Sequence, residues 1–167
     1  KGKIVAVGLL NDLETTYEPT SLFDAQGKTI IPGLIDAHAH LLNLGISMQQ
    51  VDLVGSESYQ EVLKRVINFQ ENNNSDYIIG RGWDQNDWEV KEFPTKKELD
   101  FIFPNTPVSL TRIDGHAMIV NSKAIEMAGI TKNTKIAGGE VILKNDEPSG
   151  ILIDTPMQLV WNTYPKK

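Results

Sequence analysis

Two of the three histidines in this chain lie two residues apart, directly after an apolar run. Side chains alternate between the faces of a strand, so a strand here would place His38 and His40 on the same side. Two imidazoles so placed could chelate one metal ion, and Asp36, on the same side, could orient one ring. The alternative is a pair of exposed histidines at a strand end, which leaves unexplained why two of three histidines gather here.

A second group of polar and aromatic residues follows a predicted strand. Residues 80–88 contain two tryptophans, two aspartates and two glycines. A functional interpretation places Trp83 and Asp84 on the wall of a substrate site. The structural interpretation is a loop turned by glycines, whose tryptophans anchor it to the core, and composition alone favours this second interpretation.

A third group consists of polar side chains at every second position after another predicted strand. Arg112, Asp114 and His116 have this spacing, which is typical of a strand edge that faces a site. The alternative, which residue type alone favours, is ordinary surface polarity together with a histidine whose hydrogen bonds are satisfied. We find no Ser-His-Asp order, no glycine loop for phosphate and no paired carboxylates, so no catalytic residue is assigned.

Hydrophobic periodicity and capping residues predict the elements that position these groups. Apolar runs between turn residues predict strands over residues 3–7, 23–31 (two strands about Gln26 and Gly27) and 34–38. An apolar stripe predicts a helix over residues 58–70. We expect a capping box of Ser58 and Glu61 to begin it, and the asparagines 72–74 to end it.

A further mixed segment of strands and helices is predicted after residue 76. Strands are expected over residues 77–80 and 107–111, and a hairpin over residues 138–143 and 149–153. Helix start signals lie at Thr95, Asn121 and Thr155. The helix from Asn121 would run through Ala128 and be closed by Gly129. Residues 76–155 are expected to form a compact α+β unit, with Trp83 and His116 partly exposed.

Composition excludes several classes of protein. The chain has 167 residues, 40% of them hydrophobic, and a net charge of −6. This acidic balance argues against nucleic acid and anionic membranes as partners. The absence of cysteine excludes disulfides, thiolate metal sites and a cysteine nucleophile. No apolar run approaches a membrane span, and no signal peptide is evident. We expect a cytoplasmic protein, although a leader could precede these residues in a longer chain. The chain begins without Met and reads as part of a longer one.

The chain resembles the metal-dependent amidohydrolases, and within them the branch called amidohydrolase family 3. The opening of that superfamily is matched by Pro32-Gly33-Leu34-Ile35-Asp36-Ala37-His38-Ala39-His40. The branch is matched by three later runs, namely Gly82-Trp83-Asp84-Gln85, Arg112-Ile113-Asp114-Gly115-His116 and Pro148-Ser149-Gly150-Ile151-Leu152. These matches follow one another in order over nearly the whole chain.

The resemblance implies a TIM-barrel hydrolase with a small β-sandwich. This chain would be an α+β fragment of it: a partial sandwich (residues 1–31), the first barrel strand and helix (32–75), an α+β insertion that covers the active site as a lid (76–155), and a helix leading back to the barrel (156–167). His38 and His40 would bind a divalent metal, usually zinc. Trp83, Asp84, Arg112 and His116 would lie near the substrate.

The activity implied by the resemblance is hydrolysis of carbon–nitrogen bonds in small amide-type substrates. Zinc would activate the attacking water. The family takes further ligands from later barrel strands, and no histidine follows His116 here, so we expect the fragment alone to be inactive and to bind zinc weakly. A homo-oligomer is left open. The rival hypothesis is a non-catalytic α+β binding or regulatory module with a vestigial His-x-His.

Overall fold

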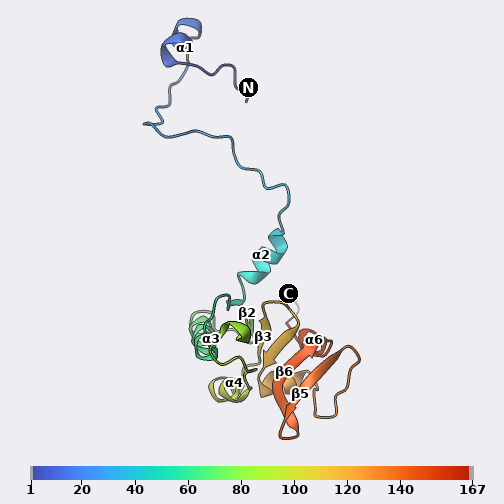
Figure 1. Cartoon of the computed structure of the whole chain (residues 1–167). Helices are drawn as coiled ribbons and strands as arrows, with labels where there is room; N and C mark the ends of the chain where they lie inside the picture. Colours follow the sequence, from blue (N-terminus) through green and yellow to red (C-terminus); the bar gives the residue numbers. More distant parts are fainter. Residues whose placement is uncertain (1, 166–167) are drawn as a thin grey trace. The chain divides into compact units, whose positions relative to one another are not determined.

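The computed structural model describes residues 2–165 and divides them between two units, residues 2–39 and residues 40–165 (Figure 1). The first unit contains one helix, α1 (Leu10–Thr16). No side chain caps its first turn, and it contains no buried residue. Lys1, Lys166 and Lys167, which belong to two of the predicted domains, lie outside the described residues.

Residues 2–39 contain no strand, so the strands predicted over residues 3–7, 23–31 and 34–38 are wrong. The predicted turn is present: Gln26 and Gly27 have left-handed φ values of 52° and 75°. Asp24 Oδ1 accepts the Gln26 N–H at 2.7 Å. A strand needs a neighbour to pair its backbone groups, and none lies against these segments among the described residues. Their composition favours strand pairing, but composition alone supplies no partner.

The second unit is built around a six-stranded mixed sheet. Its strand order is β1-β2-β3-β4-β6-β5, with β1, β2 and β3 parallel and the other neighbours antiparallel. The strands are β1 (Val51–Asp52), β2 (Ile78–Trp83), β3 (Val108–Arg112), β4 (Ala117–Val120), β5 (Gly139–Lys144) and β6 (Glu147–Asp154). The helices are α2 (Leu41–Ser47), α3 (Tyr59–Asn73), the 3-10 helix η1 (Gln85–Asp87), α4 (Lys97–Ile102), α5 (Ser122–Met127) and α6 (Met157–Trp161).

Local capping explains where two of the helices begin and end, as the sequence predicts. Ser58 accepts the Glu61 N–H at the start of α3, while Glu61 accepts the N–H of Glu57. Asn74 ends α3 in the left-handed conformation that Asn tolerates. Asn121 accepts the Ala124 N–H at the start of α5.

The other two helix starts differ from the prediction. Lys96, not Thr95, is the N-cap residue of α4, and its side chain makes no capping bond. Thr95 instead offers its carbonyl to the Tyr59 hydroxyl at 3.2 Å, which ties α3 to the segment before α4. Pro156 is the N-cap residue of α6 rather than its first helical residue.

Two apolar cores lie on opposite faces of the sheet. One contains Val62 and Val66 of α3 with Leu99 of α4, and the other contains Ala124 of α5 with Met157 of α6. Figure 1 shows α3 and α4 on one side of the strands and α6 on the other. Successive residues of β4 alternate between the two cores, so the strand is apolar throughout.

The chain therefore forms a mixed α+β sheet of six strands covered by helices. The sheet includes β1 and packs on α3, both of which precede residue 76. Residues 2–39 thus form neither the predicted sandwich strands nor the predicted first barrel strand, while the domain boundaries after residues 31, 75 and 155 stay predictions. Within residues 2–165, no helix has the length and apolar character needed to span a bilayer.

Candidate functional site

The sheet gathers polar side chains from four strands at one edge, which we call the polar edge. β2 ends at Trp83 and is followed by Asp84, and β3 ends at Arg112. β4 runs antiparallel to β3, so His116, which precedes it, lies at the same edge, and Asp154 ends β6 there. Ligands of open sheets commonly bind outside the carboxyl ends of parallel strands, which makes this edge the candidate site.

Trp83 is buried, which contradicts its predicted partial exposure. It is 0% exposed in the core beside α3, and its indole Nε1–H donates to the Leu110 carbonyl at 2.8 Å. The reason is a register shift between Arg81 and Trp83 at Gly82, whose φ is 116°. A bulge adds a residue, so the next side chain changes face. A side chain at Gly82 would also meet Val54, since its Cβ would lie 2.6 Å from Val54 Cγ2.

Arg112 and Asp114 form a bidentate ion pair at the end of β3. The guanidinium donates from Nε at 3.0 Å and from Nη2 at 2.7 Å to the two carboxylate oxygens. Arg112 also lies over the Phe93 ring, 5.8 Å from its centroid. The hydrogen bonds from Arg112 lower the pKa of Asp114 to about 2, and the same pair raises the pKa of Arg112. Both groups are therefore charged at neutral pH, and the guanidinium is held in one orientation.

His116 is paired with Asp154, a residue that the sequence analysis did not select. His116 Nδ1 lies 2.7 Å from Asp154 Oδ1, and 69% of the histidine side chain is exposed. The hydrogen bond and charge of Asp154, with the charge of Asp114, raise the pKa of His116. Asp154 directly follows the apolar residues of β6, and a polar residue at a strand end is the sequence signal that would have identified it.

Asp84 lies at the same edge, but one of its carboxylate oxygens accepts hydrogen bonds from its own loop. Asp84 Oδ1 accepts from the backbone N–H of Asn86 at 3.0 Å and from its side-chain amide at 2.8 Å, capping η1. Its negative charge acts on Arg112 and helps to raise the pKa of that group. The polar edge therefore brings together three of the four predicted substrate residues, while the fourth, Trp83, supports it from the core.

A hollow of about 550 Å³ adjoins the polar edge at the ends of β1 and β2. Asp52, Arg81 and Ile113 contribute to its lining. Arg81 donates from Nη2 to the Ile113 carbonyl at 2.9 Å, which bridges β2 to the loop after β3. Arg81 is not among the residues selected from the sequence, and its place at the end of β2 beside this hollow is evident only from the structure.

The two predicted metal ligands lie outside the sheet. Both are exposed; the N–H of His38 donates to Asp36 Oδ1 at 2.9 Å, and His40 is the N-cap residue of α2. The strand that would carry both imidazoles on one face is not formed, because residues 37 and 38 make a bend. Within residues 2–165 no three His, Asp or Glu side chains gather closely enough to hold a metal ion. Zinc sites use at least three protein ligands, so the described residues do not by themselves complete one.

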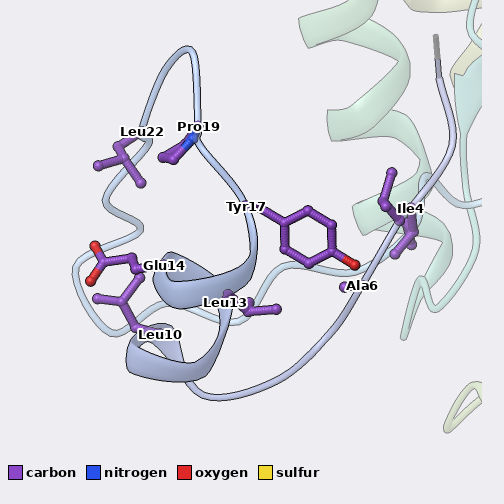
Figure 2. A pocket seen from close by; sticks show the side chains of 9 residues that line it. Ile4, Ala6, Leu10, Leu13, Glu14, Tyr17, Pro19 and Leu22 are labelled. Atoms are coloured by element: carbon purple, nitrogen blue, oxygen red, sulfur yellow. The ribbon is translucent and has the colours of Figure 1, made fainter.

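The first unit contains an apolar hollow of about 310 Å³. Figure 2 shows the Tyr17 ring between α1 and the extended segment that carries Ile4 and Ala6. Among the lining residues, only Glu14 and Tyr17 carry polar side-chain atoms. Such a lining suits an apolar group and offers little for chemistry at a polar bond.

Comparison with known proteins identifies the family. The amidohydrolase family 3 model matches residues 21–166. The chain is 36% identical to the Bacillus subtilis protein YtcJ, with 98% of this chain and 32% of YtcJ covered. It is 28% identical to the N-substituted formamide deformylase of Arthrobacter pascens, with 99% of this chain and 32% of that protein covered.

A solved structure agrees with this assignment. The crystal structure of an uncharacterized metal-dependent hydrolase from Pyrococcus horikoshii matches with a TM-score of 0.56 and 30% identity, over 77% of this chain and 23% of that one. The two curated relatives named above are longer than this chain, which spans about a third of the length of each. The motifs, the mixed sheet and these matches agree, and the chain belongs to the amidohydrolase family.

Proposed function

We propose that this chain is part of a metal-dependent hydrolase that cleaves carbon–nitrogen bonds in small amide-type substrates. Membership of the amidohydrolase family carries the proposal. Its similarity to an N-substituted formamide deformylase supports the bond type, and its similarity to a metal-dependent hydrolase supports the need for a metal. The polar edge, with Asp84, Arg112 and His116, is the part of this chain that we assign to the substrate.

The polar edge suits a small polar substrate because its donors are fixed before a ligand arrives. Asp114 holds the Arg112 guanidinium from two oxygens, and the N–H of Ile113 donates to the Trp83 carbonyl at 3.0 Å. Trp83 therefore acts as a support for the loop that carries Asp114 and His116. Donors held in place lose little entropy when an amide carbonyl binds them.

We further propose that the metal is zinc and that His38 and His40 supply two of its ligands. Neutral imidazole nitrogen is a preferred zinc ligand, and a short chain spacing limits the entropy lost in bringing two ligands together. The described residues hold no third ligand beside them, so the remaining ligands would come from elsewhere in the whole protein.

The test is metal analysis and turnover of the whole protein with His38→Ala, His40→Ala and, as a matched control, His116→Gln. We expect both alanine variants to lose bound zinc and hydrolysis of an amide panel. The control removes a histidine outside the proposed metal site, so it should keep its zinc and lose turnover. Full zinc occupancy with normal turnover in either alanine variant would overturn the metal assignment.

The same proposal predicts how the 167-residue chain behaves by itself. Two imidazoles without fixed further ligands should bind zinc only weakly, and the amide panel should not be turned over. Calorimetric titration with zinc and an assay of the same panel measure both. Micromolar or tighter zinc binding together with turnover would show that this chain already contains a complete site.

A further inference from the structure

The pair formed by His116 and Asp154 joins two neighbouring strands at the polar edge. The bond between His116 Nδ1 and Asp154 Oδ1 is 2.7 Å long, and the N–H of Asp154 donates to the His116 carbonyl at 3.0 Å. β4 begins directly after His116, and β6 ends at Asp154, with Ala117 opposite Ile153 in the register. His116 and Asp154 are therefore joined by two hydrogen bonds, one between their side chains and one between their backbones.

The backbone fixes both partners of this pair. Asp154 has a left-handed φ of 54°, a conformation that residues other than glycine adopt rarely. On the other side, the N–H of His116 donates to Asp114 Oδ1 at 3.0 Å, and Asp114 is itself held by Arg112. The orientation of the ring therefore follows from two anchored backbones rather than from the side chains alone.

We infer that Asp154 is a positioning residue for His116: its carboxylate occupies Nδ1, so that Nε2 is the ring nitrogen presented to the substrate. This inference rests on the proposed function, because it assumes that the polar edge meets the substrate. A carboxylate at one nitrogen of a histidine selects the tautomer and fixes the plane of the ring. Nothing in the sequence motifs assigns a role to Asp154.

The chemistry of the pair indicates what the substrate must present. Three charged groups face His116: Asp154 from β6, Asp114 from the β3–β4 turn and Arg112 from β3. The two carboxylates raise the pKa of His116 and outweigh the opposing charge of Arg112. With Nδ1–H bonded to Asp154, Nε2 accepts a hydrogen bond when the ring is neutral and donates one when the ring is protonated. The matching group is the N–H or the carbonyl oxygen of an amide-type substrate.

The decisive variant is Asp154→Asn, and the chain offers a matched control in Asp146→Asn. Asp146 is also an exposed aspartate with a left-handed φ, 62°, and it also pairs with a cation, Lys132, but at the far end of the β5–β6 hairpin. Asn tolerates the left-handed conformation, so both variants should keep the backbone. Equal urea unfolding curves for the two variants would confirm that they are comparably folded.

NMR titration of the histidine rings in the 167-residue chain reads out the positioning. His116→Gln assigns the third histidine signal. We expect Asp154→Asn to lower the His116 pKa towards the ordinary value of about 6.5 and to mix the two neutral tautomers, as seen in the ¹⁵N shifts. Asp146→Asn should change neither. An unchanged His116 pKa and tautomer in Asp154→Asn would overturn the inference.

Kinetics of the whole protein separate this inference from the proposed function. We expect Asp154→Asn to lower kcat/KM about tenfold, because a charged hydrogen bond is replaced by a neutral one, and the limb of the pH profile that reports His116 to move to lower pH. Asp146→Asn should keep the profile of the unmodified protein. If the NMR changes occur but Asp154→Asn and His116→Gln both turn over normally, the substrate role of His116 fails and the positioning of its ring stands.

Discussion

Asp114 is the residue whose charge the polar edge depends on most directly. It accepts both hydrogen bonds of Arg112 and one from the backbone of His116, so a proton on it would weaken three contacts at once. The Arg112 bonds, the His116 N–H and the Arg112 charge together hold the pKa of Asp114 at about 2, against about 3.9 for an unpaired aspartate. A carboxyl whose pKa is lowered by folding stabilises the fold only while it is ionised.

We therefore predict an acid dependence for Asp114→Asn. The stabilisation by Asp114 is fully present above about pH 4 and is lost as the pH falls from about 4 to about 2. The free energy of unfolding should be larger for the unmodified chain than for the variant at pH 7, and the difference should shrink across that window. Urea unfolding at several pH values measures it. A difference that stays constant down to pH 2 would contradict the ion pair.

Trp83→Phe tests the core role that the structure gives this tryptophan. Phenylalanine keeps most of the apolar volume but removes the indole N–H, which leaves the buried Leu110 carbonyl without that donor. A buried group left unpaired costs about 1–3 kcal/mol. Trp161→Phe is the control, because Trp161 is 39% exposed and its loss should cost less than about 0.5 kcal/mol. Equal costs in urea unfolding would place Trp83 outside the core.

Elements with local signals are the ones that the sequence predicts correctly. Ser58, Asn74 and Asn121 each satisfy a nearby backbone group, so their positions mark helix ends without knowledge of the fold. The sequence does not predict β4, because the strand contributes to both cores. Its four residues are all apolar and therefore lack the alternation of apolar and polar residues that marks a strand. The strands expected in residues 3–38 failed for the opposite reason: pairing partners are a property of the tertiary fold.

In the candidate site, too, some features have local sequence signals and others depend on the tertiary fold. Residue type and spacing marked Asp84, Arg112 and His116 as candidates, but only the family resemblance placed them near the substrate. The burial of Trp83 could not, since it depends on a register shift of β2 against β3. Asp154 could be noticed as a polar residue at a strand end, but its pairing with His116 could not be predicted, since that requires β6 to lie beside β4.

Asn121 should be far more important than an ordinary helix cap. It is fully buried; its Oδ1 accepts the N–H groups of Ala124 and Val108, and its Nδ2 donates to the Phe103 and Thr106 carbonyls. Asn121→Ala leaves several buried backbone groups unpaired, so we expect a loss of about 3 kcal/mol or more. Ser58→Ala, which removes a half-buried cap, should cost about 1 kcal/mol. Urea unfolding compares them, and equal losses would refute the difference.

The two units of the chain differ in how many of their side chains are buried. None of residues 2–39 is buried, and large apolar side chains are exposed there, among them Val7, Phe23, Leu34 and Ile35. Residues 40–165 contain both apolar cores. Exposed apolar surface of this extent is typical of a contact region.

Removal of residues 1–39 should therefore leave the second unit intact. We expect the chain that begins at His40 to unfold in urea at the same midpoint and with the same m-value, since none of residues 2–39 is buried. Limited proteolysis of the 167-residue chain should cut first within residues 2–39. A loss of stability above about 1 kcal/mol on truncation would mean that these residues stabilise the sheet.

The change from parallel to antiparallel pairing across the sheet has a consequence for the order in which it assembles. β5 and β6 are joined by Asn145 and Asp146, both with left-handed φ, as in a type I′ hairpin turn. Such a hairpin closes in about 1–10 μs, because its partners are neighbours in the chain. β1 is separated from β2 in the chain by the whole of α3, and β1 contributes just two residues. The strands nearest the C-terminus should therefore assemble first, and β1 should be the last strand to join.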